Sequence, residues 1–135
     1  MTNGERADRL FSEAHSVAEE MRRSFQQESW NLAFRRAQEV VELVIKGLLS
    51  EMGVDYPRTH DPAPVLVETV KQRGIQADAA LLASLADLSA HLAELRSPAF
   101  YQEIVVSGSE ARDAVDGAER VLAFGRDLLV RLRRP

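Results

Sequence analysis

Residues 29–53 read SWNLAFRRAQEVVELVIKGLLSEMG and carry the clearest helical pattern of the 135-residue chain. The apolar residues step by four and three positions, which places them on one face of an α-helix. This apolar face consists of Trp30, Phe34, Ala37, Val41, Val44 and Leu48. Gly53 follows, and glycine favours the left-handed conformation that ends many helices. The pattern predicts a helix of about 36 Å from Ser29 to Met52.

Two further helices are predicted on either side of this segment. Upstream, apolar residues again repeat at helical spacing as far as Phe25, and Thr2 and Glu5 have the spacing of a capping box. Downstream, Asp61 followed by Pro62 is typical of an N-cap with proline in the first helical position. This third helix is short and is expected to stop at Gly74.

The last third of the chain predicts two more long helices. One carries Leu81, Leu85, Leu88, Leu92 and Leu95 on a single face. It is expected to end by Ser97, because Pro98 disfavours a helical conformation of that preceding residue. Residues 98–108 then predict a loop with some extended character. A second capping box, Ser107 with Glu110, begins the final helix.

The helical pattern also predicts the fold class. No stretch shows strand-like alternation, an internal repeat or low complexity. Each amphipathic helix has to bury its apolar face, and short connections favour antiparallel neighbours. We therefore predict an all-α, up-and-down antiparallel helical bundle of four long helices and one short helix, forming a single domain over residues 1–135.

Two of the predicted helices have apolar faces wider than one seam of a bundle requires. Val40 and Ile45 widen the face of the second helix, and Leu122 and Leu129 widen that of the last. Spare apolar width on a bundle helix is often covered by a second chain. This pattern predicts a homodimer whose interface lies on the second or the last helix.

Composition excludes several classes of protein. Hydrophobic residues make up 45% and charged residues 28%, which is typical of a soluble globular protein. The absence of cysteine excludes disulfides, thiol nucleophiles and sulfur-ligated metals. No apolar run reaches the roughly 20 residues of a membrane span, and the first residues lack the apolar core of a signal peptide, so we expect a cytoplasmic location. The net charge of −4 disfavours bulk, charge-driven nucleic-acid binding, although 15 of the 17 cations are arginine.

The common catalytic and metal-binding signatures are missing. The chain has no glycine-rich phosphate loop and no nucleophile motif. His15, His60 and His91 do not have metal-ligand spacing. The sequence therefore predicts neither a metal site nor a cofactor.

Two stretches nevertheless resemble a known family. The first is AQEVVELVIKGLL at residues 37–49, followed by YPRTHD at residues 56–61. The second is ELRSPAFY at residues 94–101, with Ser-Glu-Ala at 109–111 before the last helix. In this order they resemble the HEPN family of small helical-bundle proteins, from about Phe11 to Leu132. The residues of the first stretch that match the family pattern are Gln38, Glu42, Lys46, His60 and Asp61.

The resemblance implies an activity and its partners. HEPN ribonucleases use an arginine followed after four to six residues by a histidine, assembled across a dimer interface. Arg96 matches that arginine, but no histidine follows His91, and Tyr101 occupies the corresponding place. We therefore expect a non-catalytic or degenerate HEPN homodimer that binds a nucleotide or RNA. The resemblance also implies a minimal nucleotidyltransferase as partner, in a module of toxin–antitoxin type. The alternatives are a metal-independent endoribonuclease and an interaction module without a ligand.

The candidate binding residues are Arg96, Phe100 and Tyr101, together with Glu42, Lys46 and His60. Arginine holds a phosphate through paired bonds, and a tyrosine ring offers a surface on which a base stacks. Alternatively, Phe100 packs the bundle end and Tyr101 fills the loop.

The other three candidates also have two interpretations. Glu42 and Lys46 are either an exposed pair four residues apart on a helix or a pair that faces a groove and orients Arg96 or a ligand. His60 and Asp61 are either part of the site or a device that starts the third helix, in which Asp61 caps the helix and His60 closes the turn over the bundle end.

Overall fold

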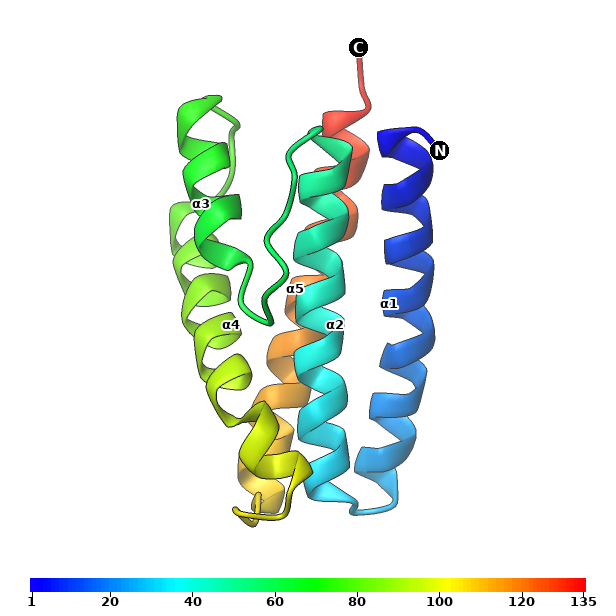
Figure 1. Cartoon of the computed structure of the whole chain (residues 1–135), viewed down its shortest axis with the longest axis vertical. Helices are drawn as coiled ribbons and strands as arrows, with labels where there is room; N and C mark the ends of the chain where they lie inside the picture. Colours follow the sequence, from blue (N-terminus) through cyan, green and yellow to red (C-terminus); the bar gives the residue numbers. More distant parts are fainter.

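The computed structural model describes residues 1–135 and consists of five α-helices with no β-strand (Figure 1). The four long helices alternate in direction, and both chain termini lie at the same end of the bundle (Figure 1). This confirms the predicted all-α bundle of four long helices and one short helix. The helices are α1 (Asn3–Gln26), α2 (Trp30–Glu51), α3 (Ala63–Gln72), α4 (Ala79–Phe100) and α5 (Gly108–Leu132).

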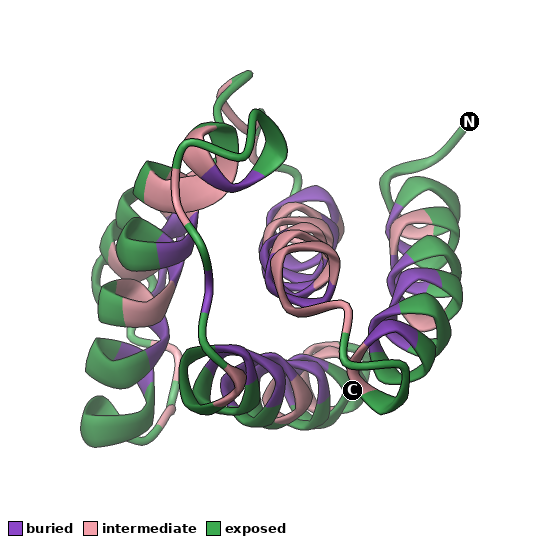
Figure 2. Cartoon of the chain, turned by 90° about the horizontal axis from the view of Figure 1, so that it is seen from below, coloured by how far each residue is buried: buried purple, intermediate pink, exposed green.

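Helix α2 is the centre of the bundle. Seen along the bundle axis, it is surrounded by the other four helices (Figure 2). It buries 12 of its 22 residues, and these include Val40 and Ile45. Leu122 of α5 is likewise buried inside the chain. The extra apolar width of α2 is thus used within one chain, so the part of the prediction that placed a dimer interface on α2 was wrong.

Two glycines allow the helices around α2 to approach closely. A Cβ atom on Gly47 would lie 2.7 Å from the Phe11 ring, and one on Gly125 would lie 3.3 Å from the same ring. Phe11 of α1 therefore packs into the space that α2 and α5 leave open. A larger residue at either glycine would push the three helices apart.

Four of the helices are followed by a residue in the left-handed conformation. Gly53 and Gly74 have φ values of 70° and 59°, which confirms the predicted ends of α2 and α3. Glu28 after α1 and Gln102 after α4 have φ values of 60° and 57°. At each end, two backbone N–H groups bond to carbonyls of the last helical turn, as Glu28 and Ser29 do after α1.

The structure confirms both capping boxes and corrects two other expected helix boundaries. Helix α3 begins at Ala63 without a side-chain cap, so the assignment of Asp61 as its N-cap was wrong. Helix α4 continues through Pro98 to Phe100, three residues beyond the expected end. Proline is tolerated there because only one backbone hydrogen bond of the last turns lacks its donor.

The left-handed conformation of Glu28 predicts a stabilising substitution. Glu28→Gly should raise the free energy of unfolding by about 0.5–1 kcal/mol, because a Cβ in this conformation costs about 1–2 kcal/mol and the greater freedom of glycine in the unfolded chain offsets part of the gain. Urea unfolding measures the change. Glu28→Ala keeps the Cβ atom and is the matched control. An equal gain in both variants would assign the effect to the lost carboxylate.

Candidate functional site

The site is built around the side chain of Gln38, a polar residue of α2 that is only 1% exposed. Its Oε1 accepts a 2.7 Å hydrogen bond from Nε of Arg96 on α4. Its Nε2 donates to Oε1 of Glu42 at 2.9 Å and to the backbone oxygen of His60 at 3.1 Å. One amide thus joins α2, α4 and the connection between α2 and α3.

Glu42 is held by three neighbours. Nζ of Lys46 donates to its Oε2 at 2.6 Å, and Nδ1 of His60 lies 2.7 Å from its Oε1, beside the bond from Gln38. Burial raises the pKa of Glu42, but these three hydrogen bonds outweigh burial and hold the pKa below its usual value. Because Glu42 and Lys46 are mostly buried, they form a groove-facing pair rather than an exposed one.

The connection between α2 and α3 returns along the side of α2 (Figure 1). This path brings His60 beside Glu42, about halfway along the length of the bundle. The expectation that His60 closes a turn over the bundle end was therefore wrong. Asp61 accepts a 2.6 Å hydrogen bond from the Ser89 hydroxyl of α4 instead of capping α3. Both residues therefore fasten the connection to the long helices.

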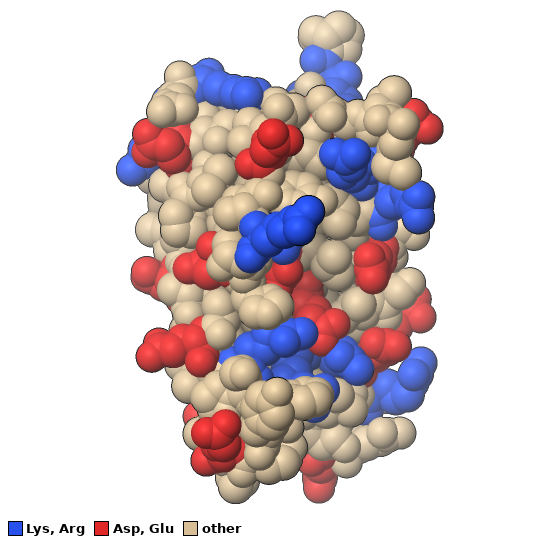
Figure 3. Space-filling model, viewed as in Figure 1, with Lys and Arg blue, Asp and Glu red and all other residues tan.

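Arg96 lies in a cluster of three arginines. Arg36 is paired with Glu39 at 2.6 Å, whereas Arg96 is 4.0 Å from the same carboxylate and Arg35 forms no ion pair. Burial lowers the pKa of the Arg35 guanidinium, and the positive charges of Arg36 and Arg96 lower it further. Figure 3 shows one group of Lys and Arg side chains below the middle of the molecule, and others spread over its upper half. The cluster therefore carries more positive charge than its carboxylates neutralise.

Two aromatic rings border this cluster. Phe100 and Tyr101 are 52% and 67% exposed, so neither packs the bundle end or fills the loop. Their rings meet edge to face with centroids 5.0 Å apart. The Arg35 guanidinium lies 4.7 Å from the Phe100 centroid, a cation–π contact. Guanidinium groups and accessible rings are thus adjacent.

Sequence reasoning missed Asn31, which positions the connection between α4 and α5. Its Nδ2 donates to the backbone oxygens of Ala99 and Ile104 at 3.1 and 2.9 Å, and its Oδ1 accepts from the N–H of Val106 at 2.8 Å. These bonds fix the backbone on both sides of Tyr101. No local pattern identifies Asn31, because its partners are about 70 positions away in the chain.

The six predicted site residues fall into two groups. Arg96, Phe100 and Tyr101 lie at the arginine cluster, to which the structure adds Arg35. The other three, Glu42, Lys46 and His60, line a separate cavity of about 290 Å³ together with Arg58 and Thr59. Gln38 is the link between the two groups.

Neither a metal centre nor a membrane segment is found. No group of three or more His, Cys, Asp or Glu side chains is arranged to hold a metal ion. None of the five helices combines the length and apolarity that crossing a bilayer demands.

A family model of the HEPN domain matches residues 7–128. The chain belongs to the HEPN domain family. A crystal structure of an archaeal HEPN homologue has the same fold, with a TM-score of 0.69 at 18% identity, over 91% of this chain and 97% of that chain. A comparison with curated proteins finds no match. The family membership confirms the resemblance indicated by the two sequence stretches.

As a HEPN protein, the chain departs from the ribonuclease pattern at Arg96. The side-chain partners of Arg96 are Gln38 and Glu39, and no histidine contacts it. His60 contacts Glu42, and the His91 ring packs edge-on against Phe34. The arrangement can hold an anion, but it offers no imidazole beside the arginine for proton transfer.

The lowered pKa of Glu42 predicts a pH-dependent contribution to stability. Ionised Glu42 stabilises the fold fully above the usual pKa of 4.5, and the contribution is lost as the pH falls through the lowered pKa. Glu42→Gln should therefore cost about 1.5–3 kcal/mol at pH 7 and less near pH 3. Urea unfolding across this range measures the difference. Glu94→Gln, at an exposed site on α4, is the control; a cost of Glu42→Gln that does not change with pH would contradict the prediction.

Proposed function

We propose that the chain is a degenerate HEPN protein that binds the phosphate groups of RNA or a nucleotide without cleaving them. The observation that carries this proposal is the unpaired guanidinium of Arg35, which lies over Phe100 and beside Arg96. Tyr101 adds an exposed ring at the same place. The net charge of −4 makes such a local cluster, rather than bulk attraction, the source of binding.

The chemistry of the cluster favours binding over turnover. Arginine forks hold phosphate oxygens with charge-assisted bonds, and a base stacks on tyrosine with a gain of about 1–3 kcal/mol. Cleavage at a ribose needs a group that takes the proton of the 2′-hydroxyl. Tyr101 is a poor base near neutral pH, because tyrosine has an unperturbed pKa of about 10. Glu42, which is linked to Arg96 through Gln38, is occupied by three hydrogen-bonding neighbours.

Binding at the cluster predicts the effect of two substitutions. Arg35→Ala and Tyr101→Ala should each weaken binding of a fluorescent single-stranded RNA oligonucleotide at least tenfold, because each removes an interaction of about 1.5–3 kcal/mol. Arg35 is half-buried and Tyr101 is exposed, and neither side chain is hydrogen-bonded within the chain, so the melting temperature should change little. Fluorescence anisotropy measures the affinity. Arg112→Ala removes an exposed arginine of α5 and is the matched control.

Arg96→Ala is the poorer probe, because it also leaves the buried Oε1 of Gln38 without a donor. Unchanged affinity in both the Arg35 and Tyr101 variants would reject the site. The same RNA is incubated with the protein to test for cleavage. Efficient cleavage that Arg96→Lys abolishes would favour the metal-independent ribonuclease, whereas no binding and no cleavage would favour an interaction module.

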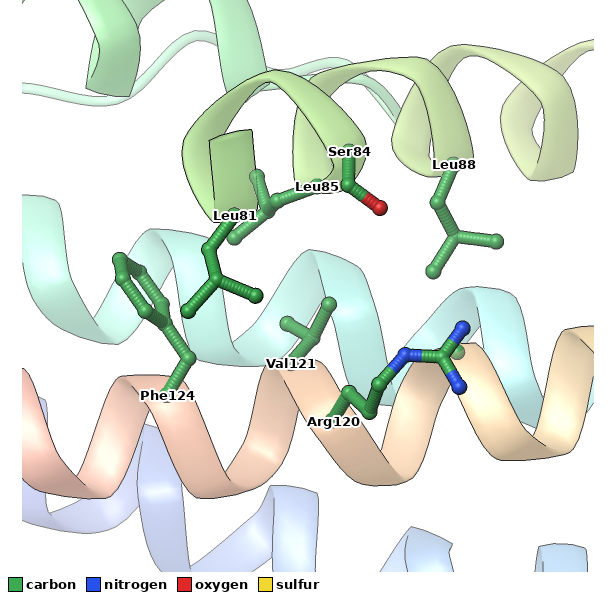
Figure 4. A pocket seen from close by; sticks show the side chains of 8 residues that line it. Leu81, Ser84, Leu85, Leu88, Arg120, Val121 and Phe124 are labelled. Atoms are coloured by element: carbon green, nitrogen blue, oxygen red, sulfur yellow. The ribbon is translucent and has the colours of Figure 1, made fainter. Parts of the chain in front are cut away.

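A homodimer and a nucleotidyltransferase partner complete the proposal. The support for a dimer is an apolar groove between α4 and α5, in which Leu81, Leu85 and Leu88 face Val121 and Phe124 (Figure 4). Leu81 at its rim is 48% exposed, although it is a large apolar residue. The support for a minimal nucleotidyltransferase in a toxin–antitoxin-type module is HEPN membership. A short nucleotidyltransferase reading frame beside this gene is the observation that tests it.

The proposed dimer predicts a sedimentation result. At micromolar concentration the chain should sediment at twice its mass of 15.0 kDa. Leu81→Glu should shift it to the monomer, because it places a charge against the apolar groove. Val130→Glu introduces the same charge at a different exposed apolar residue, which lies on α5, and should leave the dimer intact. A single wild-type species of monomer mass would reject the dimer.

A further inference from the structure

A second basic cleft lies at the other end of the molecule and is lined by the first half of α1 and the connection that follows α2. It comprises two cavities of about 570 and 310 Å³ that share Arg6 and Tyr56. Arg9 lines the larger cavity, and Arg58 lines the smaller one. Fifteen helical residues separate Arg35 from Ser50 in the cleft wall, or about 22 Å along α2. The cleft is therefore distinct from the arginine cluster of the proposed function.

The arginines of the cleft are not used by the fold. Arg6, Arg9 and Arg58 form neither ion pairs nor side-chain hydrogen bonds. Arg133, by contrast, lies near the same end of α1 and is bonded to Asp8 and Glu51. The three arginines that line the cleft thus keep their donors free of partners within the chain. Five N–H donors on each planar guanidinium suit a phosphate group better than a single backbone carbonyl.

Tyr56 gives the cleft an aromatic surface. Its ring is half-buried and lines both cavities, and Nζ of Lys46 lies 5.6 Å from the ring centroid. Lys46 is itself fixed by its 2.6 Å bond to Glu42, so the ring rests against an ordered neighbour. A ring held in this way offers a flat surface next to Arg6.

The cleft also contains hydrogen-bond acceptors. Glu13 lines the larger cavity and Asp55 the smaller one, so two carboxylates accompany the three guanidinium groups. A bare polyanion would be repelled by the carboxylates. A ligand that combines phosphate groups with hydroxyl donors and a flat ring satisfies all of these side chains at once.

We propose that this cleft is a second binding site, and that it takes a free nucleoside phosphate. Arg6 and Arg58 bind the phosphate groups from opposite walls of the smaller cavity. The base stacks on Tyr56, and the ribose hydroxyl groups donate to the carboxylate of Glu13 or Asp55. The site does not depend on the Arg35–Arg96 cluster or on its ligand.

Isothermal titration with ATP, inorganic triphosphate and adenosine tests this site on the intact chain. Wild-type protein should bind ATP more tightly than triphosphate or adenosine, because only ATP engages the arginines and the ring together. Arg6→Ala combined with Arg58→Ala should weaken ATP binding at least tenfold. Tyr56→Leu should weaken ATP binding but leave triphosphate binding unchanged. Arg112→Ala combined with Arg126→Ala changes the net charge equally on α5 and is the matched control.

The variants also separate this site from the proposed function. Arg35→Ala should weaken RNA binding and leave ATP binding unchanged, and the double variant of Arg6 and Arg58 should do the reverse. Circular dichroism and melting verify that each variant is folded. The proposal is overturned if ATP does not bind, if triphosphate binds as tightly as ATP, if the control pair weakens ATP equally, or if only Arg35→Ala removes ATP binding.

Discussion

The buried amide of Gln38 is the constraint on which the functional face depends. The Gln38 side chain is only 1% exposed, and an unpaired amide buried in this way costs about 1–3 kcal/mol. Gln38 is satisfied only when Arg96, Glu42 and the backbone of His60 are all in place. One side chain therefore ties the position of α4 to the path of the connection after α2. This explains why the chain carries polar residues in the middle of the helix that buries the most residues.

The same bonds determine which charges remain free to bind a ligand. Glu42 and Lys46 neutralise each other in the groove, and Arg36 is paired with Glu39. Arg35 is left without a partner and rests on Phe100, while Asn31 holds the backbone that carries the neighbouring ring. Pairing inside the bundle thus concentrates unpaired positive charge at its edge. The binding that we propose at this edge thus rests on how the core is satisfied, not on an excess of basic residues.

Local sequence patterns predicted the features that depend on a single helix and missed those that depend on contacts between two helices. Apolar spacing, both capping boxes and the ends at Gly53 and Gly74 are local properties, and all were confirmed. Asp61 has the local form of an N-cap, but the Ser89 hydroxyl of a distant helix takes its carboxylate. The width of the α2 face indicated a second chain because spacing does not reveal that a helix is central. Asn31 was missed because a helical asparagine acquires its role only when the end of α4 folds against it.

A net charge of −4 constrains how this chain can hold a phosphate at either of the two proposed sites, the arginine cluster and the second cleft. Long-range attraction is absent, so affinity has to come from short-range contacts that only a correctly placed ligand makes. The first site has the unpaired guanidinium of Arg35 beside Arg96, and the second has three unpaired guanidinium groups. Each also has an accessible ring, which suits one or two nucleotides better than a long strand. Carboxylates near each site, Glu39 at one and Asp55 at the other, disfavour extended polyanions. The negative charge therefore favours, at both proposed sites, a short ligand with its own ring and hydroxyl groups over bulk nucleic acid.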